Sequence, residues 1–153
     1  MARPMSPERE KEFEELLAFL DFHDEIFTKP KLPADMPSRL SLRGEADRIA
    51  KEYGRSKALE GTRQAMNDVI EELNNLTAEG VELLDRTLLD SGLQTLSEMR
   101  RRYSALYRKV LRRGKINTET EYYLVNGLVV DQSSTLTTEE RTLLQDIVSA
   151  YEG

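Results

Sequence analysis

Cysteine and tryptophan are absent from this chain of 153 residues, and histidine occurs once. Without cysteine the chain has no disulfide bond, no thiolate nucleophile and no cysteine-ligated metal centre. The one histidine, His23, has only apolar residues three and four positions away: Phe19, Leu20, Ile26 and Phe27. A histidine–carboxylate ligand set with ordinary helical spacing therefore cannot form around it. We predict no metal, no cofactor and no catalytic residue, and a partly buried position for His23.

Long apolar runs are also missing. No stretch approaches the ~18 uninterrupted apolar residues that a membrane-spanning helix needs, and residues 1–7 lack the apolar region of a secretory signal peptide. Glycine-rich phosphate loops and the G-x-S-x-G nucleophile motif are absent as well. We expect a cytoplasmic protein with no membrane partner and no enzymatic activity. An activity based on carboxylates alone, or on magnesium, stays open because acidic side chains are abundant.

Proline is confined to the first 37 residues. Because proline lacks the backbone N–H and clashes with the preceding turn, it is nearly excluded from helix interiors. Ser6 and Pro7 form a good helix start, so we predict a helix over 7–27 and a proline-containing crossover loop over 28–41. A chain of this length is most simply one domain. We therefore expect one all-α domain over 1–153, whose core at 42–153 completes a bundle of six or seven helices.

The region 42–76 allows either one bent helix or two helices. Gly54 lies at its centre, and glycine commonly ends a helix because it tolerates the left-handed conformation. We favour a break at Gly54, with helices on both sides.

Later helix starts carry side-chain caps. Thr77 is expected to cap a helix that reaches Asp90. Each of the next three helices begins with a Thr-x-x-Glu capping box, in which the hydroxyl accepts the third N–H and the glutamate returns to the cap N–H. The boxes are Thr95 with Glu98, Thr118 with Glu121, and Thr137 with Glu140.

The segment 122–130 is ambiguous. Asn126-Gly127 between two apolar runs is a strong signal for a β-hairpin. The runs lack two-residue alternation, however, and a helix start lies just upstream at Thr118. An isolated two-stranded hairpin is also only marginally stable. We predict a helix.

One segment is strongly basic. Residues 99–118 hold eight lysines and arginines and no acidic residue, so they carry +8 in a chain of net charge −6. We predict one helix over 95–113, ended by Gly114. On such a helix the cations lie opposite the apolar side chains or at their edge. The candidate residues for binding an anionic partner are Arg101, Arg102, Arg108, Lys109, Arg112 and Arg113.

Several partners would suit this basic segment, 100–115. Phosphates of a nucleic acid would bind it with a strong dependence on salt, and acidic groups of another protein would pair with it. The cations could equally pair with this protein's own acidic helices, or simply face solvent.

The N-terminal helix is apolar on more than one side. All four phenylalanines lie on it, and Phe19, Phe22 and Ile26 spread away from the main apolar face. A helix of this kind is either enclosed by its own fold or covered by a second chain. We treat Phe19, Phe22 and Ile26 as a candidate protein interface, with a homodimer as one form of it.

These patterns favour a non-enzymatic protein-binding or regulatory protein that docks on another protein. The alternative is a nucleic-acid-associated regulator that contacts phosphates through the basic segment. The identity of the partner is not written in the sequence.

Overall fold

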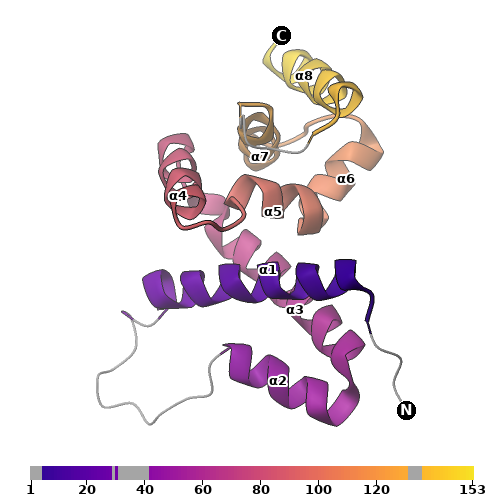
Figure 1. The fold of residues 1–153 in the computed structure, drawn as a ribbon. Coiled ribbons are helices and arrows are strands. Elements are labelled where there is room, and N and C mark those ends of the chain that lie inside the picture. Colours follow the sequence, from indigo (N-terminus) through magenta and orange to yellow (C-terminus); the bar gives the residue numbers. More distant parts are fainter. Residues whose placement is uncertain (1–4, 29, 31–41, 131–135) are drawn as a thin grey trace. The chain divides into compact units, whose positions relative to one another are not determined.

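The computed structural model describes residues 5–28, 30, 42–130 and 136–153, and all regular structure in these ranges is helical (Figure 1). The all-α prediction is thereby confirmed for the described residues. The loop predicted over 28–41 lies almost entirely outside them. In chain order the elements are α1 (Pro7–His23), the π-helical η1 (Asp24–Thr28), α2 (Leu42–Tyr53), α3 (Arg55–Glu72), the 3-10 turn η3 (Leu73–Asn75), α4 (Ala78–Asp90), α5 (Leu96–Tyr103), α6 (Ala105–Arg113), α7 (Glu119–Val130) and α8 (Thr138–Glu152).

The chain divides into two compact units, Met1–Met66 and Asn67–Gly153, and the boundary falls within α3. We call them the N-terminal unit and the C-terminal unit and describe each by itself. The single domain over 1–153 stays a prediction.

In the N-terminal unit, carboxylates of α1 form ion pairs with α2 and α3. Arg43 of α2 binds Glu14 at 3.1 Å. Arg55 of α3 binds Glu10 at 2.6 Å and lies over the ring of Phe13. Arg63, which lies further along α3, binds Glu12 at 2.7 Å. The Arg55 guanidinium also lowers the pKa of the Glu10 carboxyl by donating hydrogen bonds to it. Much of the acidic side of α1 is therefore engaged within its own unit.

The predicted break at Gly54 is confirmed. Its φ of +98° is a left-handed conformation that side chains with a Cβ rarely adopt, which is why glycine stands there. The Gly54 N–H donates to the Ala50 carbonyl at 2.9 Å, closing the last turn of α2 before α3 starts at Arg55.

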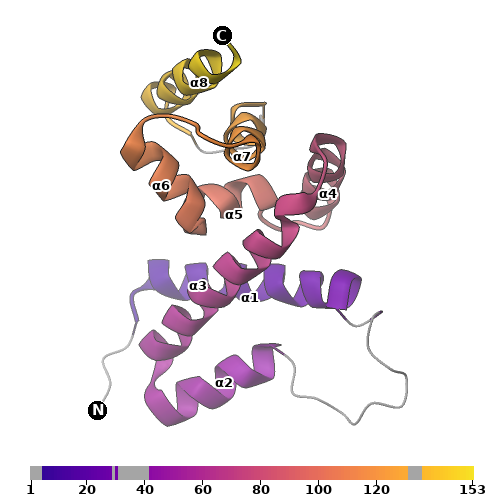
Figure 2. The same ribbon diagram turned by 180° about the vertical axis from the view of Figure 1, so that it is seen from behind.

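In the C-terminal unit, α7 occupies the centre. It packs against α8, α6, α5 and α4, as Figures 1 and 2 show. The segment 122–130 is thus helical, as predicted, rather than a hairpin. The buried side chains around α7 are Tyr107, Val110, Ile116, Leu124, Val125, Leu128, Leu144, Ile147 and Val148.

The three predicted threonine caps form. The hydroxyls of Thr95, Thr118 and Thr137 accept the N–H groups of the third residue at 3.0, 3.2 and 3.0 Å. At Thr118 the returning half of the box also forms, because the Thr118 backbone N–H donates to the Glu121 carboxylate. Two of the glutamates have further partners. Glu121 accepts the N–H of Asn117 at 2.8 Å, and Glu140 accepts the hydroxyl of Tyr107 at 3.0 Å. At Glu121 the Asn117 N–H therefore adds a second backbone donor to the box, and at Glu140 a tertiary partner is bound.

The single helix predicted over 95–113 is wrong. The chain becomes extended at Ser104, with ψ at 118°, and two helices, α5 and α6, replace the one. The Ser104 hydroxyl accepts the N–H of Tyr107 at 3.1 Å and so caps α6. Serine competes well for backbone groups and favours such caps over helix interiors. This break is why the described residues hold eight α-helices rather than six or seven.

Candidate functional site

The candidate basic residues fall on two helices and do not form one stripe. Arg101 and Arg102 lie on the last turn of α5, and both bind Glu98 at 2.7 Å. Glu98 is almost completely buried, with 1% of its surface exposed. Hydrogen bonds from Arg101 to this carboxylate raise the pKa of the arginine. These two cations stabilise the protein's own fold.

The remaining candidates lie on α6. Arg113 binds the buried Glu121 of α7 and also donates to the Lys115 carbonyl at 3.1 Å. Arg108 donates to the Arg102 carbonyl at 2.8 Å. Its side chain is nevertheless exposed, as are those of Lys109 and Arg112. Three of the six predicted residues are thus paired with the protein's own carboxylates, and three remain on the surface.

Phe19, Phe22 and Ile26 differ in exposure. Phe19 is 2% exposed and belongs to the buried set, whereas Phe22 is half-buried and Ile26 is 53% exposed. His23 is 5% exposed and stacks on Phe27 with ring centroids 5.2 Å apart. The interface stays a prediction, and within it Ile26 offers the most accessible apolar surface.

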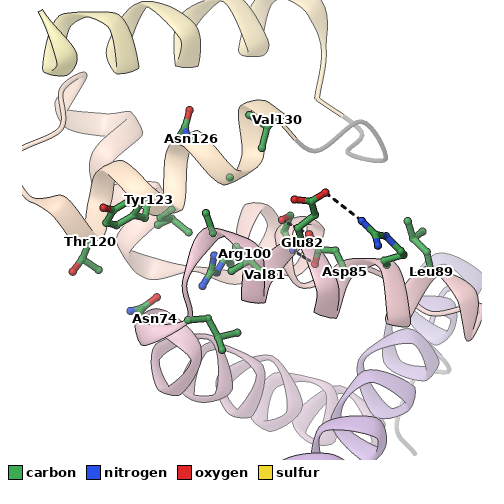
Figure 3. Close-up of a pocket in the computed structure, with 16 residues that line it drawn as sticks. Asn74, Val81, Glu82, Asp85, Leu89, Arg100, Thr120, Tyr123, Asn126 and Val130 are labelled. Carbon is green, nitrogen blue, oxygen red and sulfur yellow. Dashed lines mark hydrogen bonds and ion pairs between the residues drawn. The ribbon is translucent and has the colours of Figure 1, made fainter.

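The described residues of the C-terminal unit form an open groove. It runs between α4 and α7, has a volume of about 730 Å³, and has Ser97 and Arg100 of α5 at its base. Figure 3 shows the lining side chains, Arg100 among them. Ligand sites typically have volumes of about 300–1,000 Å³. The lining residues are Asn74, Leu76, Ala78, Val81, Glu82, Asp85, Arg86, Leu89, Ser97, Arg100, Thr120, Tyr123, Leu124, Asn126, Gly127 and Val130.

Part of the groove edge is apolar and open. Leu89 at the end of α4 is 50% exposed, and Tyr123 and Val130 of α7 are 50% and 66% exposed. Gly127 lies between those two α7 residues in the sequence and on the same helical side. A Cβ placed on Gly127 would meet no atom within 4 Å. The missing side chain therefore widens the groove along α7.

The base of the groove is fixed by a contact between α4 and α5. The Asp85 carboxylate accepts the Ser97 hydroxyl at 2.6 Å and the Ser97 N–H at 3.3 Å. Ser97 lies in the first turn of α5, where carboxylates are favoured by the free N–H groups and the helix dipole. Arg100 follows one turn later on the same side of α5. Asp85 thereby positions the helix that carries Arg100.

Arg100 is the most unusual charge in the groove. It is 4% exposed, and Figure 3 shows it between α4 and α7. Its Nη2 donates to the Leu73 carbonyl at 3.1 Å, while its Nε has no acceptor. Burial lowers the pKa of the guanidinium, and the negative charge of Asp85 opposes that shift. Within the described part of the chain, no carboxylate forms an ion pair with Arg100.

Sequence patterns alone do not reveal this site. Arg100 was counted among the cations of the basic segment without a separate role, and Asn126-Gly127 was weighed only as a turn signal. The available clue was a glycine in an apolar helix, on the same side as Tyr123 and Val130. That clue becomes informative only when α4 and α5 are known to lie beside this side of α7.

Among the described residues, no cluster of three metal-ligating side chains occurs, and no helix has the length and apolar character needed to cross a membrane.

Comparison with known proteins found no match to this chain among protein-family models, curated proteins or solved structures.

Proposed function

We propose that this chain is a non-enzymatic binding protein that docks on another protein, and that its docking site is the groove between α4 and α7. The observation that supports the proposal is an open groove of about 730 Å³ with half-exposed apolar edges. Helical peptide segments commonly bind in such grooves by inserting apolar side chains spaced three or four residues apart. The cytoplasm remains the predicted location.

The charges of the groove favour an apolar occupant over a strongly basic or acidic one. Glu82 and Arg86 pair with each other at the edge, at 3.3 Å. Asp85 is hydrogen-bonded to Ser97 at the base. Of the two arginines among the described lining residues, Arg86 has a carboxylate partner and Arg100 has none. The edge residues, by contrast, offer apolar surface that a partner would cover.

Affinity capture from the organism that encodes the chain tests this function. The baits are the wild type, Leu89→Lys at the groove edge, and Leu143→Lys on α8 as a matched control. Leu89 and Leu143 are similarly exposed, at 50% and 47%, but only Leu89 lines the groove. Central apolar anchors of an interface commonly contribute more than ~1.4 kcal/mol, which is about tenfold in affinity.

We expect a stoichiometric partner to bind the wild type and the control, and at least about tenfold less to bind Leu89→Lys. Equal recovery by all three baits, or recovery of no stoichiometric partner, would overturn the proposal.

A nucleic-acid-associated regulator is the second candidate. The observation that favours it is the exposure of Arg108, Lys109 and Arg112 along α6. If these three cations contact phosphates, the logarithm of the DNA-binding constant should fall with the logarithm of salt concentration with a slope of about −3. Triple replacement by glutamate should abolish binding. Absence of DNA and RNA binding at ~50 mM salt would rule this candidate out.

A further inference from the structure

We infer that the occupant of the α4–α7 groove presents a carboxylate to the Arg100 guanidinium, as an aspartate or glutamate side chain within an apolar segment of the partner protein. The inference rests on the proposed function, because it assigns the chemistry of the same groove.

The first step is the hydrogen bonding of Arg100. A guanidinium carries five N–H donors. In this structure one acceptor, the Leu73 carbonyl, receives a hydrogen bond from Nη2, and the buried Nε has none. A buried polar group without an acceptor is costly, and a buried charge more so. Arg100 is therefore short of acceptors in a groove that is open to an occupant.

The second step is that Asp85, the nearest source of negative charge, is already in use. Both oxygens of Asp85 accept hydrogen bonds from Ser97. Its charge acts on Arg100 at a distance and without an ion pair. If Asp85 turned to bind Arg100, the first turn of α5 would lose its acceptor. Asp85 is therefore not available as the acceptor that Arg100 lacks, and an occupant of the groove can supply it.

The third step concerns the kind of acceptor. A carboxylate matches the planar guanidinium with two parallel hydrogen bonds, which makes it a strong partner for a buried arginine. A phosphate dianion is less suitable, because Glu82 and Asp85 line the same groove and would repel its larger charge. The walls near the base include Val81 and Leu124, which are both buried. The carboxylate should therefore be carried on an apolar body.

Selection of a partner is a reason for an arginine, rather than an apolar residue, to occupy position 100. A well-packed apolar residue in place of a buried ion is often neutral or stabilising for the fold. An arginine that is buried with one carbonyl acceptor contributes little to stability, and its charge can discriminate between occupants.

A titration with small probes tests the inference. The full chain, labelled with ¹⁵N, is titrated with 4-phenylbutyrate and, separately, with the uncharged 4-phenylbutyramide. Arg100→Met removes the charge and keeps an apolar chain of similar length. Gly127→Leu fills the groove without altering Arg100, since a Cβ at Gly127 meets no atom within 4 Å. Circular dichroism establishes that each variant is folded.

We expect 4-phenylbutyrate to shift the amide signals of Tyr123 and Gly127 and the Nε–H signal of Arg100, with at least about tenfold tighter binding than the amide. Arg100→Met should abolish this difference between the probes, and Gly127→Leu should weaken both. If the two probes bind equally to the wild type, or if neither shifts these signals, the inference is overturned. If Arg100→Met does not fold, the comparison of the two probes on the wild type is still a test, because equal binding overturns the inference.

Partner capture separates this inference from the proposed function. If Leu89→Lys loses the partner but a folded Arg100→Met retains it fully, the docking function stands and the carboxylate inference fails. If the probes bind as expected while capture is unaffected by Leu89→Lys, the groove recognises apolar carboxylates but is not the docking site. The inference that a segment of the partner protein carries the carboxylate is then wrong.

Discussion

Glu98 and Arg100 lie two positions apart on α5 and are both buried, yet their surroundings differ. Glu98 binds Arg101 and Arg102, whereas Arg100 has one carbonyl acceptor. A buried charge that has lost its partners is strongly destabilising. At the scale of single residues, Glu98 therefore stabilises the fold, and Arg100 is available to bind a partner.

Glu98→Gln should lower the free energy of unfolding by about 2–3 kcal/mol. The full cost of breaking a buried ion pair is ~3–5 kcal/mol, and the partial exposure of the two arginines reduces it. Glu82→Gln is the control, since Glu82 pairs with Arg86 on the surface, and it should change stability by less than ~0.5 kcal/mol. Urea denaturation measures both. Equal effects at the two sites would contradict the role given to Glu98.

Two glycines with equally open surroundings should respond in opposite directions to alanine. Gly127 lies inside α7 with helical φ, so Gly127→Ala should raise the free energy of unfolding by up to about 1 kcal/mol. Gly54 has φ at +98°, so Gly54→Ala should lower it by ~1 kcal/mol or more. Thermal unfolding of both variants checks the signs. A stabilising Gly54→Ala would show that the break between α2 and α3 is wrongly placed.

At the scale of elements, the break between α5 and α6 determines which cations reach the surface. The extended conformation at Ser104 frees the Arg102 carbonyl, which accepts a hydrogen bond from Arg108. It also changes the direction of the chain, so that the six candidate cations no longer share a face. The groove depends on the same region, because α5 carries both Ser97 and Arg100.

Ser104→Ala should lower the free energy of unfolding by about 1 kcal/mol, the usual contribution of a helix N-cap. The Ser104 hydroxyl accepts one of the free N–H groups in the first turn of α6, that of Tyr107. Ser149→Ala, at an exposed position inside α8, is the control and should be neutral or slightly stabilising because alanine favours helices. Chemical denaturation distinguishes the two. A Ser104→Ala protein as stable as the wild type would mean that the cap contributes nothing.

Helix ends were predictable from the sequence where their signals are local. Gly54, Thr77 and Thr137 each act within one turn of their own position. Ser104 was missed because the apolar spacing continues across it and no glutamate follows three residues later to complete a capping box. Tertiary packing determines whether the chain forms one continuous helix or two helices with a capped break. The spacing of apolar residues in the sequence carries no information on that packing.

The candidate site could not be predicted in the same way. Its lining comes from α4, α5, α7 and the segment around η3, and only their packing brings Leu89, Arg100 and Tyr123 together. The cluster of cations near α5 and α6 is visible in the sequence. The sequence could not distinguish the buried Arg100 from its exposed neighbours, because the walls around it come from other parts of the unit.

At the scale of the whole molecule, the net charge of −6 conceals paired carboxylates in both units. Glu10 pairs with Arg55 in the N-terminal unit, and Glu121 pairs with Arg113 in the C-terminal unit. Burial would raise the pKa of Glu121. Hydrogen bonds from the Asn117 N–H and the nearby Arg113 charge outweigh it, so that its pKa lies below its ordinary value of 4.5.

The protein should lose stability as the pH falls below about 4.5, the ordinary pKa of glutamate. Carboxyls with a lowered pKa in the folded state stabilise it above their unfolded pKa, and protonation removes this contribution. The stability difference between wild type and Glu121→Gln should therefore be greatest at pH 7 and shrink through pH 4 to pH 3. Urea denaturation at each pH measures it. A difference that is constant with pH would contradict the ion pair.

The most direct test of the docking groove is site-specific crosslinking to the captured partner. A photoreactive phenylalanine analogue replaces Tyr123, on the groove edge, or Tyr151, on α8 outside the groove lining. The two tyrosines are similarly exposed, at 50% and 42%. We predict a covalent adduct with the partner from position 123 and none from position 151. An adduct from position 151 alone, or from neither position while the partner is still captured, would contradict the assignment of the groove as the docking site.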